Sequence, residues 1–179
     1  MNANKEKMMK MSKVLSIILF SIAIAFIAMI SILIMFVLLA PVLDFELTLE
    51  QVNFLTTTPD FSFNDLDGIR AWMTDMVLGS VLMISVLFVA GSIFKAISRE
   101  GTPFTKKNSD KIRIIALLLI ANEVVIPPLQ MLVKMIAIPG LAQSAEIRLI
   151  NIVVAAMFFC LALIFDYGRQ LQQESDETL

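Results

Sequence analysis

The sequence predicts an all-α integral membrane protein with four transmembrane helices, and three observations support this prediction. Of its 179 residues, 58% are hydrophobic and only 17% are charged, a composition outside the range of soluble domains. Apolar segments lie at residues 14–40, 71–97, 112–138 and 147–165, and each is long enough to cross a hydrocarbon core as an α-helix. Short polar connections separate these segments, so residues 1–179 are expected to form a single transmembrane domain.

The first apolar segment, residues 14–40, follows a basic N-terminus with four lysines and one acid. Its apolar run is about twice the length of the hydrophobic region of a signal peptide, so we expect an uncleaved helix. Ser21, Ala25 and Ala28 form a small-residue face at helical spacing, which would let a second helix approach closely. Ordinary lipid-facing positions explain these three residues equally well, and the sequence leaves both interpretations open.

The connection at residues 44–70 is polar and contains six acids and one base. Within it, the run from Asn64 to Gly68 is similar to part of a calcium-binding loop. A calcium loop aligned on this run would need a carboxylate at its last ligand position, where the sequence has Thr74. We therefore expect a solvated acidic loop without a metal site.

The second apolar segment, residues 71–97, begins near Trp72, an aromatic residue suited to the membrane interface. Asp75 lies about one helical turn further in, and its carboxylate is expected to reach back to that interface. A buried functional carboxylate is the alternative that the sequence leaves open. Gly79 and Gly91 provide positions at which another helix could pack closely.

A basic connection, residues 98–111, contains a turn at Gly101 that must end the preceding helix. A basic loop beside a membrane usually sets the topology and attracts anionic lipid. The second interpretation is the docking of a protein partner, for which the candidate residues are Gly101, Pro103, Phe104 and Arg113.

The third apolar segment, residues 112–138, carries polar residues at its centre. Asn122 and Glu123 lie in the middle of the run, and Pro127 and Pro128 follow one turn later. Because proline has no N–H group, the pair leaves two backbone carbonyls, four residues earlier, without their helical donors. We expect a helix broken at Pro127-Pro128, in an environment of protein or water that can bond these carbonyls.

Glu123 is the main candidate functional residue, because a carboxylate in hydrocarbon is costly and must face protein, water or a partner. It lies about 17 Å along the helix from Ile112, near the midplane of a core about 30 Å thick. Together with Asn122 and Gln130, it would bind a cation or exchange a proton. A structural role in helix packing and contact with a partner are the alternatives.

The distribution of bases predicts the orientation. The N-terminus, residues 95–113 and the polar tail at residues 166–179 together hold eleven Lys and Arg, whereas Arg70, Lys134 and Arg148 fall on the other side. The positive-inside rule then places both termini in the cytoplasm. If the proline pair made the third segment re-enter instead of crossing, the tail would lie outside, and this alternative stays open.

Two groups of residues carry a resemblance to a known family. The first is Gly101-Thr102-Pro103-Phe104 with Asn108 and Lys111-Ile112-Arg113, and the second is the run from Leu171 to Leu179. With the layout of the four spans, they resemble the YoaS-like family of small bacterial four-helix membrane proteins, a domain of unknown function (DUF2975). The resemblance implies no established activity. It implies a partner, because members often look like partners of small helix-turn-helix regulators, which suggests membrane-linked control of transcription.

Two functions are consistent with these residues. The first is a non-enzymatic membrane regulator or sensor that binds a cytoplasmic protein through the basic connection and the acidic tail residues Glu174, Asp176 and Glu177. The second is a small carrier, or an immunity or resistance protein, in which Glu123 binds a cation or a proton. Since four spans are few for a transporter, the second function would require a homo-oligomer.

Enzymatic chemistry is not expected. The sequence has no histidine, and its single cysteine, Cys160, lies inside an apolar segment, which excludes His-based catalytic sites, zinc clusters and a disulfide framework. No second carboxylate lies at a depth that matches Glu123. We therefore expect no catalytic residue, no cofactor, no metal and no direct nucleic-acid binding. Apart from the lipid bilayer, the expected partners are a cytoplasmic DNA-binding regulator and a second copy of the chain.

Overall fold

The computed structural model describes residues 3–39, 66–137 and 149–177, and within these ranges every regular element is an α-helix. The helices are α1 (Ala3–Leu39), α2 (Leu66–Glu100), α3 (Lys106–Val124), α4 (Ile126–Ala137) and α5 (Leu149–Glu177). Most of the acidic connection expected at residues 44–70, with most of its calcium-like run, lies outside the described residues.

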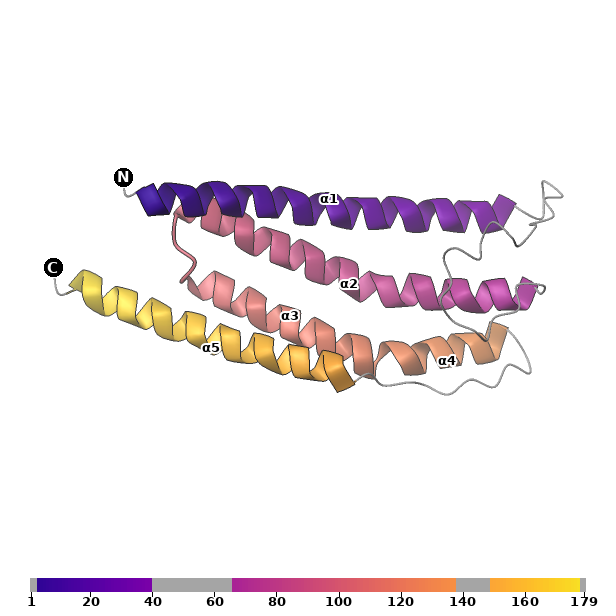
Figure 1. The fold of residues 1–179 in the computed structure, drawn as a ribbon. Helices are drawn as coiled ribbons and strands as arrows, with labels where there is room; N and C mark the ends of the chain where they lie inside the picture. Colours follow the sequence, from indigo (N-terminus) through magenta and orange to yellow (C-terminus); the bar gives the residue numbers. More distant parts are fainter. Residues whose placement is uncertain (1–2, 40–65, 138–148, 178–179) are drawn as a thin grey trace.

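The helices include stretches that are long and apolar enough to cross a membrane: Ala3–Met35, Ala71–Glu100, Lys106–Ile136 and Leu149–Ser175. The third of these consists of α3 and α4 placed end to end (Figure 1). The predicted all-α fold with four membrane-spanning helices is therefore confirmed. At one end the helices continue past the apolar segments, since α1 begins at Ala3 and α5 continues to Glu177.

The helices follow one another across the molecule in the order α1, α2, α3 and α5, and α4 extends α3 (Figure 1). The start of α1 and the end of α5 lie at the same end of the molecule, called here the N/C end. Over their described lengths, no Cα atoms of α1 and α5 lie within 8 Å of one another. The first and last helices do not meet, so the four form an open layer instead of a closed bundle.

α1 packs against α2 through small residues. Ser12, Ser16 and Ala23 are the buried residues in the described part of α1, and their spacing places them on one helical face. The Ser16 hydroxyl donates a hydrogen bond to the carbonyl oxygen of Gly91 at 2.9 Å. The absence of a side chain at Gly91 permits this close approach.

Of the two interpretations left open for Ser21, Ala25 and Ala28, contact with another helix of the described chain is not observed, because all three residues are exposed. α2 instead packs on the face that carries Ser12 and Ser16. A serine combines the close approach that a small residue allows with a hydrogen bond to the neighbouring helix. The expected face lies on the opposite side of α1.

The apolar core lies between α2, α3 and α5. Its buried residues come from all three helices and are Ile93, Ile97, Ile112, Ile115, Leu119, Ala155 and Ala162. The two alanines allow α5 to approach α3 closely, and the Ser109 hydroxyl donates a hydrogen bond to the carbonyl oxygen of Ala162 at 3.0 Å. This core holds α3 and α5 against each other.

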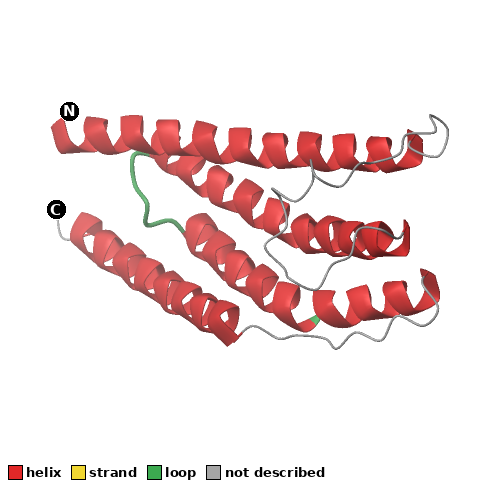
Figure 2. Ribbon diagram, turned by 45° about the vertical axis from the view of Figure 1, so that its right-hand side comes forward, coloured by secondary structure: helices red, strands yellow, loops and turns green. Residues whose placement is uncertain are grey.

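The third membrane-spanning stretch is interrupted at Val125, in the short loop between α3 and α4 (Figure 2). The Val125 N–H still donates to the carbonyl oxygen of Ala121 at 2.9 Å, and the Leu129 N–H donates to the Val125 carbonyl at 3.2 Å. Pro127 and Pro128 occupy the first turn of α4, where a missing N–H group costs least. The predicted break is confirmed, and it lies at Val125, two residues before the proline pair.

Close packing at Gly91 generates a prediction. A Cβ atom added to Gly91 would lie 3.2 Å from the Phe20 ring, whereas the nearest atom to one added at Gly79 is the Gln130 side-chain nitrogen, at 3.6 Å. Gly91→Ala is expected to be less stable than Gly79→Ala by about 1 kcal/mol, because overpacking opposes the gain in helix propensity that both variants share. Thermal unfolding in detergent measures the difference.

A second substitution controls for the cause of this difference. Phe20→Leu in the Gly91→Ala background removes the ring atoms that the new methyl group meets, so it should recover part of the lost stability. Equal melting temperatures for Gly91→Ala and Gly79→Ala would contradict the packing described between α1 and α2.

Candidate functional site

Glu123 lies in the last turn of α3, directly before the break, and only 5% of its surface is exposed. Its carboxylate accepts a hydrogen bond from the side-chain amide of Asn151, near the start of α5. α3 and α5 are therefore joined by a polar contact as well as by the apolar core. In the interior of a membrane, such a bond offsets part of the cost of burying a carboxylate.

The helix geometry places this contact near the middle of the membrane. Asp75 and Lys95 of α2 are twenty residues apart, which corresponds to about 30 Å of helix, the thickness of a typical hydrocarbon core. On α3, Glu123 lies ten residues from Arg113, or about half that distance. The break in the third stretch therefore falls at the depth where backbone is hardest to solvate.

Oxygen acceptors are concentrated around the break. Since Pro127 and Pro128 have no N–H group, two carbonyls in the last turn of α3 lose their helical donors. The side-chain oxygen of Asn122 is buried and has no hydrogen-bond partner within the described part of the chain. With the Glu123 carboxylate, these oxygens suit a cation, or a group that can donate N–H or O–H bonds.

Gln130, which was expected to assist Glu123, lies elsewhere. It belongs to α4, and its side-chain nitrogen donates a hydrogen bond to the backbone oxygen of Asp75 on α2 at 3.0 Å. The structure therefore brings Asn151 to Glu123, with Asn122 adjacent in the chain, and uses Gln130 to hold α4 on α2.

Asn151 is the site residue that was missing from the sequence-based candidates. The sequence does contain a feature that points to Asn151, because it is the only amide side chain in residues 147–165. An amide inside a membrane-spanning helix favours a polar partner on a neighbouring helix. The buried carboxylate of Glu123 is that partner.

A second polar contact joins α2 to α4 beside Gln130. The Lys134 ammonium lies 2.5 Å from a carboxylate oxygen of Asp75, and the side chains are 6% and 40% exposed, respectively. Asp75 thus pairs with a base instead of reaching the interface alone. The sequence contains a signal for this pair, because Asp75 lies four residues after the start of residues 71–97 and Lys134 four residues before the end of residues 112–138.

The turn between α2 and α3 contacts both α1 and α5 at the N/C end. Gly101 has a φ of 67°, the left-handed conformation that favours glycine at the end of a helix. A Cβ atom at Gly101 would also collide with the side chain of Lys5 on α1. The next residue, Thr102, donates a hydrogen bond from its hydroxyl to the side-chain oxygen of Gln172 on α5, at 3.0 Å.

Pro103 and Phe104 continue these contacts. The side-chain amide of Asn108 donates a hydrogen bond to the carbonyl oxygen of Pro103 at 3.0 Å. The Phe104 ring packs edge-on against Phe165 with 5.5 Å between the ring centroids. It also lies directly against the backbone of Gly168, where an added Cβ atom would come 2.7 Å from the ring. The residues of the turn therefore pack it against α5.

Arg113 also contacts α5, through an ion pair with Asp166, and it lies 3.4 Å from Asp110. The four partner-docking candidates at this turn thus all take part in contacts within the chain. The acidic tail differs, because Glu174 and Glu177 are exposed at the end of α5. The side chain of Asp176 lies outside the described residues.

A family model described as "Protein of unknown function (DUF2975)" matches residues 54–179. The matched range includes α2 to α5, and with them the contact between Glu123 and Asn151 and the turn at Gly101. No curated protein and no solved structure matches the chain.

The ion pair between Asp75 and Lys134 generates the prediction of this section. Asp75→Asn is expected to cost on the order of 2 kcal/mol, because it removes the charge partner of a buried ammonium group. Lys134→Met is expected to cost less, since Asp75 is 40% exposed and stays partly solvated. Thermal unfolding of both variants and of the double variant measures these effects.

The double variant is the control for a true pairwise interaction. The double variant, Asp75→Asn with Lys134→Met, should lose less stability than the two single variants lose together, because it leaves no buried charge without its partner. Strictly additive losses would show that the two side chains do not interact.

Proposed function

Since the chain belongs to the DUF2975 family of proteins of unknown function, we propose its activity from its residues: a non-enzymatic regulator or sensor in the bacterial cytoplasmic membrane. The chain has four helical stretches long and apolar enough to cross a membrane, as a multi-pass membrane protein has. In this proposal the N/C end faces the cytoplasm, as the excess of Lys and Arg at that end favours. There it binds a soluble protein partner.

The observation that carries this proposal is the course of α5. This helix begins near Asn151, which bonds to the buried Glu123, and continues without a break to Glu177. Its 29 residues correspond to about 43 Å, so it is longer than a hydrocarbon core is thick. A change at the buried contact would therefore shift the exposed end of the same helix, because a helix moves as a rigid element.

The turn at Gly101 has a supporting role in this proposal. Its contacts with Gly168 and Gln172 hold α5 on one side, just before the exposed acids Glu174 and Glu177. These acids, and not the turn itself, are the proposed contact for the partner. The turn instead fixes their position relative to the other helices.

The family resemblance implies a small helix-turn-helix regulator as the partner. DNA-binding proteins carry basic surfaces, and an acidic helix end is complementary to such a surface. We do not propose an enzyme, because the partner of Glu123 in α5 is an amide and neither a nucleophile nor a second carboxylate.

Deletion of residues 174–179 tests this proposal. The deletion removes the exposed acids but retains Gln172 and Gly168, so it should abolish capture of the partner while the turn stays seated. The measurement is a pull-down of the tagged intact and shortened chains from native membranes, with the captured proteins identified by mass spectrometry. Glu123→Gln is the matched control, because it keeps an acceptor oxygen for Asn151 and should capture the same protein.

A soluble DNA-binding protein captured by the intact chain and by Glu123→Gln, but not by the shortened chain, is the expected result. Identical proteins captured by the intact and shortened chains would contradict a partner bound at the acidic end.

A small carrier, or an immunity or resistance protein, is a second candidate function. The break beside Glu123 favours it, because interrupted membrane helices often bind ions at the midplane with freed carbonyls and a carboxylate. This function makes the opposite prediction for the same variants. In vesicles, Glu123→Gln would abolish cation or proton flux, and deletion of residues 174–179 would leave the flux unchanged.

A further inference from the structure

Two lysines from different helices lie against the same part of α2. The ammonium nitrogen of Lys95, on α2 itself, lies 5.9 Å from the centroid of the Phe20 ring of α1. The ammonium nitrogen of Lys111, on α3, lies 3.4 Å from the backbone carbonyl oxygen of Ser92. Ser92 and Lys95 are three residues apart, so they lie on one side of α2. The two ammonium groups therefore approach α2 within about one turn of each other.

The depth of these groups is set by the residues that they contact. The Phe20 ring lies against Gly91, where an added Cβ atom would come 3.2 Å from it, so both ammonium groups lie near the level of Gly91 and Ser92. Gly91 is sixteen residues from Asp75 along α2, or about 24 Å, in a hydrocarbon core about 30 Å thick. The two ammonium groups therefore lie at the edge of this core, whereas lysines near helix ends usually extend outward to water.

No carboxylate neutralises these two lysines within the described ranges. The ion pairs there, with N–O distances up to 4 Å, are Glu6–Lys10, Asp110–Arg113, Asp166–Arg113 and Asp75–Lys134. Arg99, one turn after Lys95 on the same side of α2, is exposed and adds a third base without such a partner. Positive charge at the edge of the hydrocarbon core is stabilised by an anion, and the membrane itself supplies one.

Exposed apolar residues lie on the membrane side of both lysines. Phe88 precedes Lys95 by seven residues, and its ring also packs on Phe20, with 5.7 Å between the ring centroids, so it lies on the same side of α2. Ile114 follows Lys111 by three residues on α3, one turn deeper, and is also exposed. Bases at the edge of the core with apolar surface below them match the two parts of a phospholipid, its phosphate and its acyl chains.

We propose that Lys95, Arg99 and Lys111 bind the phosphate of an anionic phospholipid, whose acyl chains lie against Phe88 and Ile114. A zwitterionic headgroup carries a cation of its own, which the three bases repel, so charge selects an anionic lipid. Because Lys95 contacts α1 and Lys111 belongs to α3, the bound lipid connects three helices at the N/C end. This site does not depend on the partner proposed for the acidic end of α5.

Native mass spectrometry of the full chain, purified in detergent and titrated with phosphatidylglycerol or phosphatidylcholine, tests the site. The intact chain should retain several-fold more phosphatidylglycerol than phosphatidylcholine. Lys95→Gln with Lys111→Gln should remove this preference, because it removes two of the three bases that face the phosphate. Equal retention of the two lipids by the intact chain, or an unchanged preference in the double variant, would overturn the proposal.

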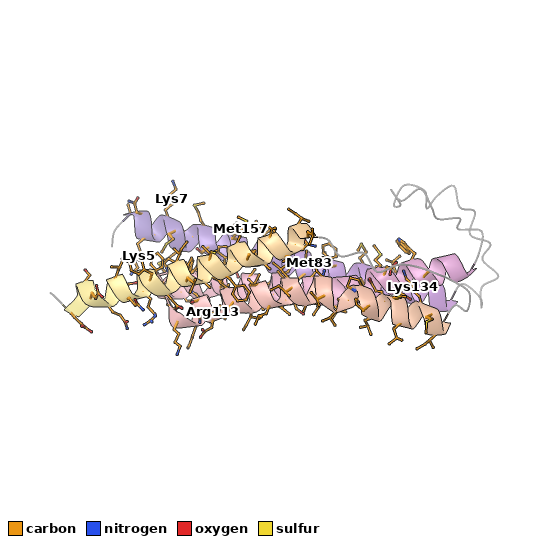
Figure 3. All side chains as sticks on the ribbon, turned by 90° about the horizontal axis from the view of Figure 1, so that it is seen from below. Lys5, Lys7, Met83, Arg113, Lys134 and Met157 are labelled. Atoms are coloured by element: carbon orange, nitrogen blue, oxygen red, sulfur yellow. The ribbon has the colours of Figure 1, made fainter. Side chains whose placement is uncertain are left out.

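The matched control is Lys7→Gln with Lys10→Gln. It removes the same charge at the same end of the molecule, but Lys7 points away from the other helices (Figure 3), and Lys10 pairs with Glu6. This variant should keep the preference for phosphatidylglycerol. Equal losses in the two glutamine variants would indicate a diffuse attraction of the whole basic end for anionic lipid, and would refute a site at Lys95 and Lys111.

Two further measurements separate recognition of the lipid from other causes. Lys95→Arg with Lys111→Arg keeps both charges and should keep the preference, whereas its loss would show that charge does not carry the binding. Inorganic phosphate in excess should leave phosphatidylglycerol bound to the intact chain, since it has no acyl chains to pack on Phe88 and Ile114. Displacement of the lipid by phosphate would assign the bases to a soluble anion and overturn the lipid site.

Discussion

The burial of the Glu123 carboxylate near the middle of the membrane is the constraint on which the rest of the structure depends. A charge or a strong acceptor at this depth requires a partner, and the structure supplies Asn151 from α5. The same turn of α3 has carbonyls to which the following prolines cannot donate a hydrogen bond, because proline has no N–H group. The helix is interrupted there and resumes as α4. The proline pair therefore sets where α3 ends, and the polar contact beside it helps to hold α5 against α3.

Polar contacts at three depths hold the layer together, with small and apolar residues between them. The Asp75–Lys134 pair joins α2 to α4, the Glu123–Asn151 bond joins α3 to α5, and the turn at Gly101 joins α5 to α1. Apolar side chains gain little from leaving lipid for one another, so helix association in a membrane relies on close packing and hydrogen bonds. α5 takes part at two of these depths, which suits it to connect the buried site with the exposed acidic end.

The sequence predicted the helical class, the four spans and the break at the proline pair, because hydropathy and proline chemistry act locally along the chain. It did not predict which face of α1 meets α2, or that Gln130 and Lys134 both contact Asp75. These depend on the rotation and depth of one helix against another, which no local pattern encodes. For Phe104 and Arg113 the sequence left the docking of a partner open as a second interpretation. Both residues contact α5 of their own chain, through Phe165 and Asp166, which no local pattern indicated.

A double-mutant cycle on Glu123 and Asn151, read by thermal unfolding in detergent, tests the central claim most directly. Glu123→Leu and Asn151→Leu should each destabilise the protein, because each leaves one polar side chain inside a membrane-spanning helix without the other. The double variant should lose less than the sum of the two, with a coupling on the order of 1 kcal/mol. Additive losses would show that the carboxylate and the amide do not interact, and that the midplane contact does not position α5.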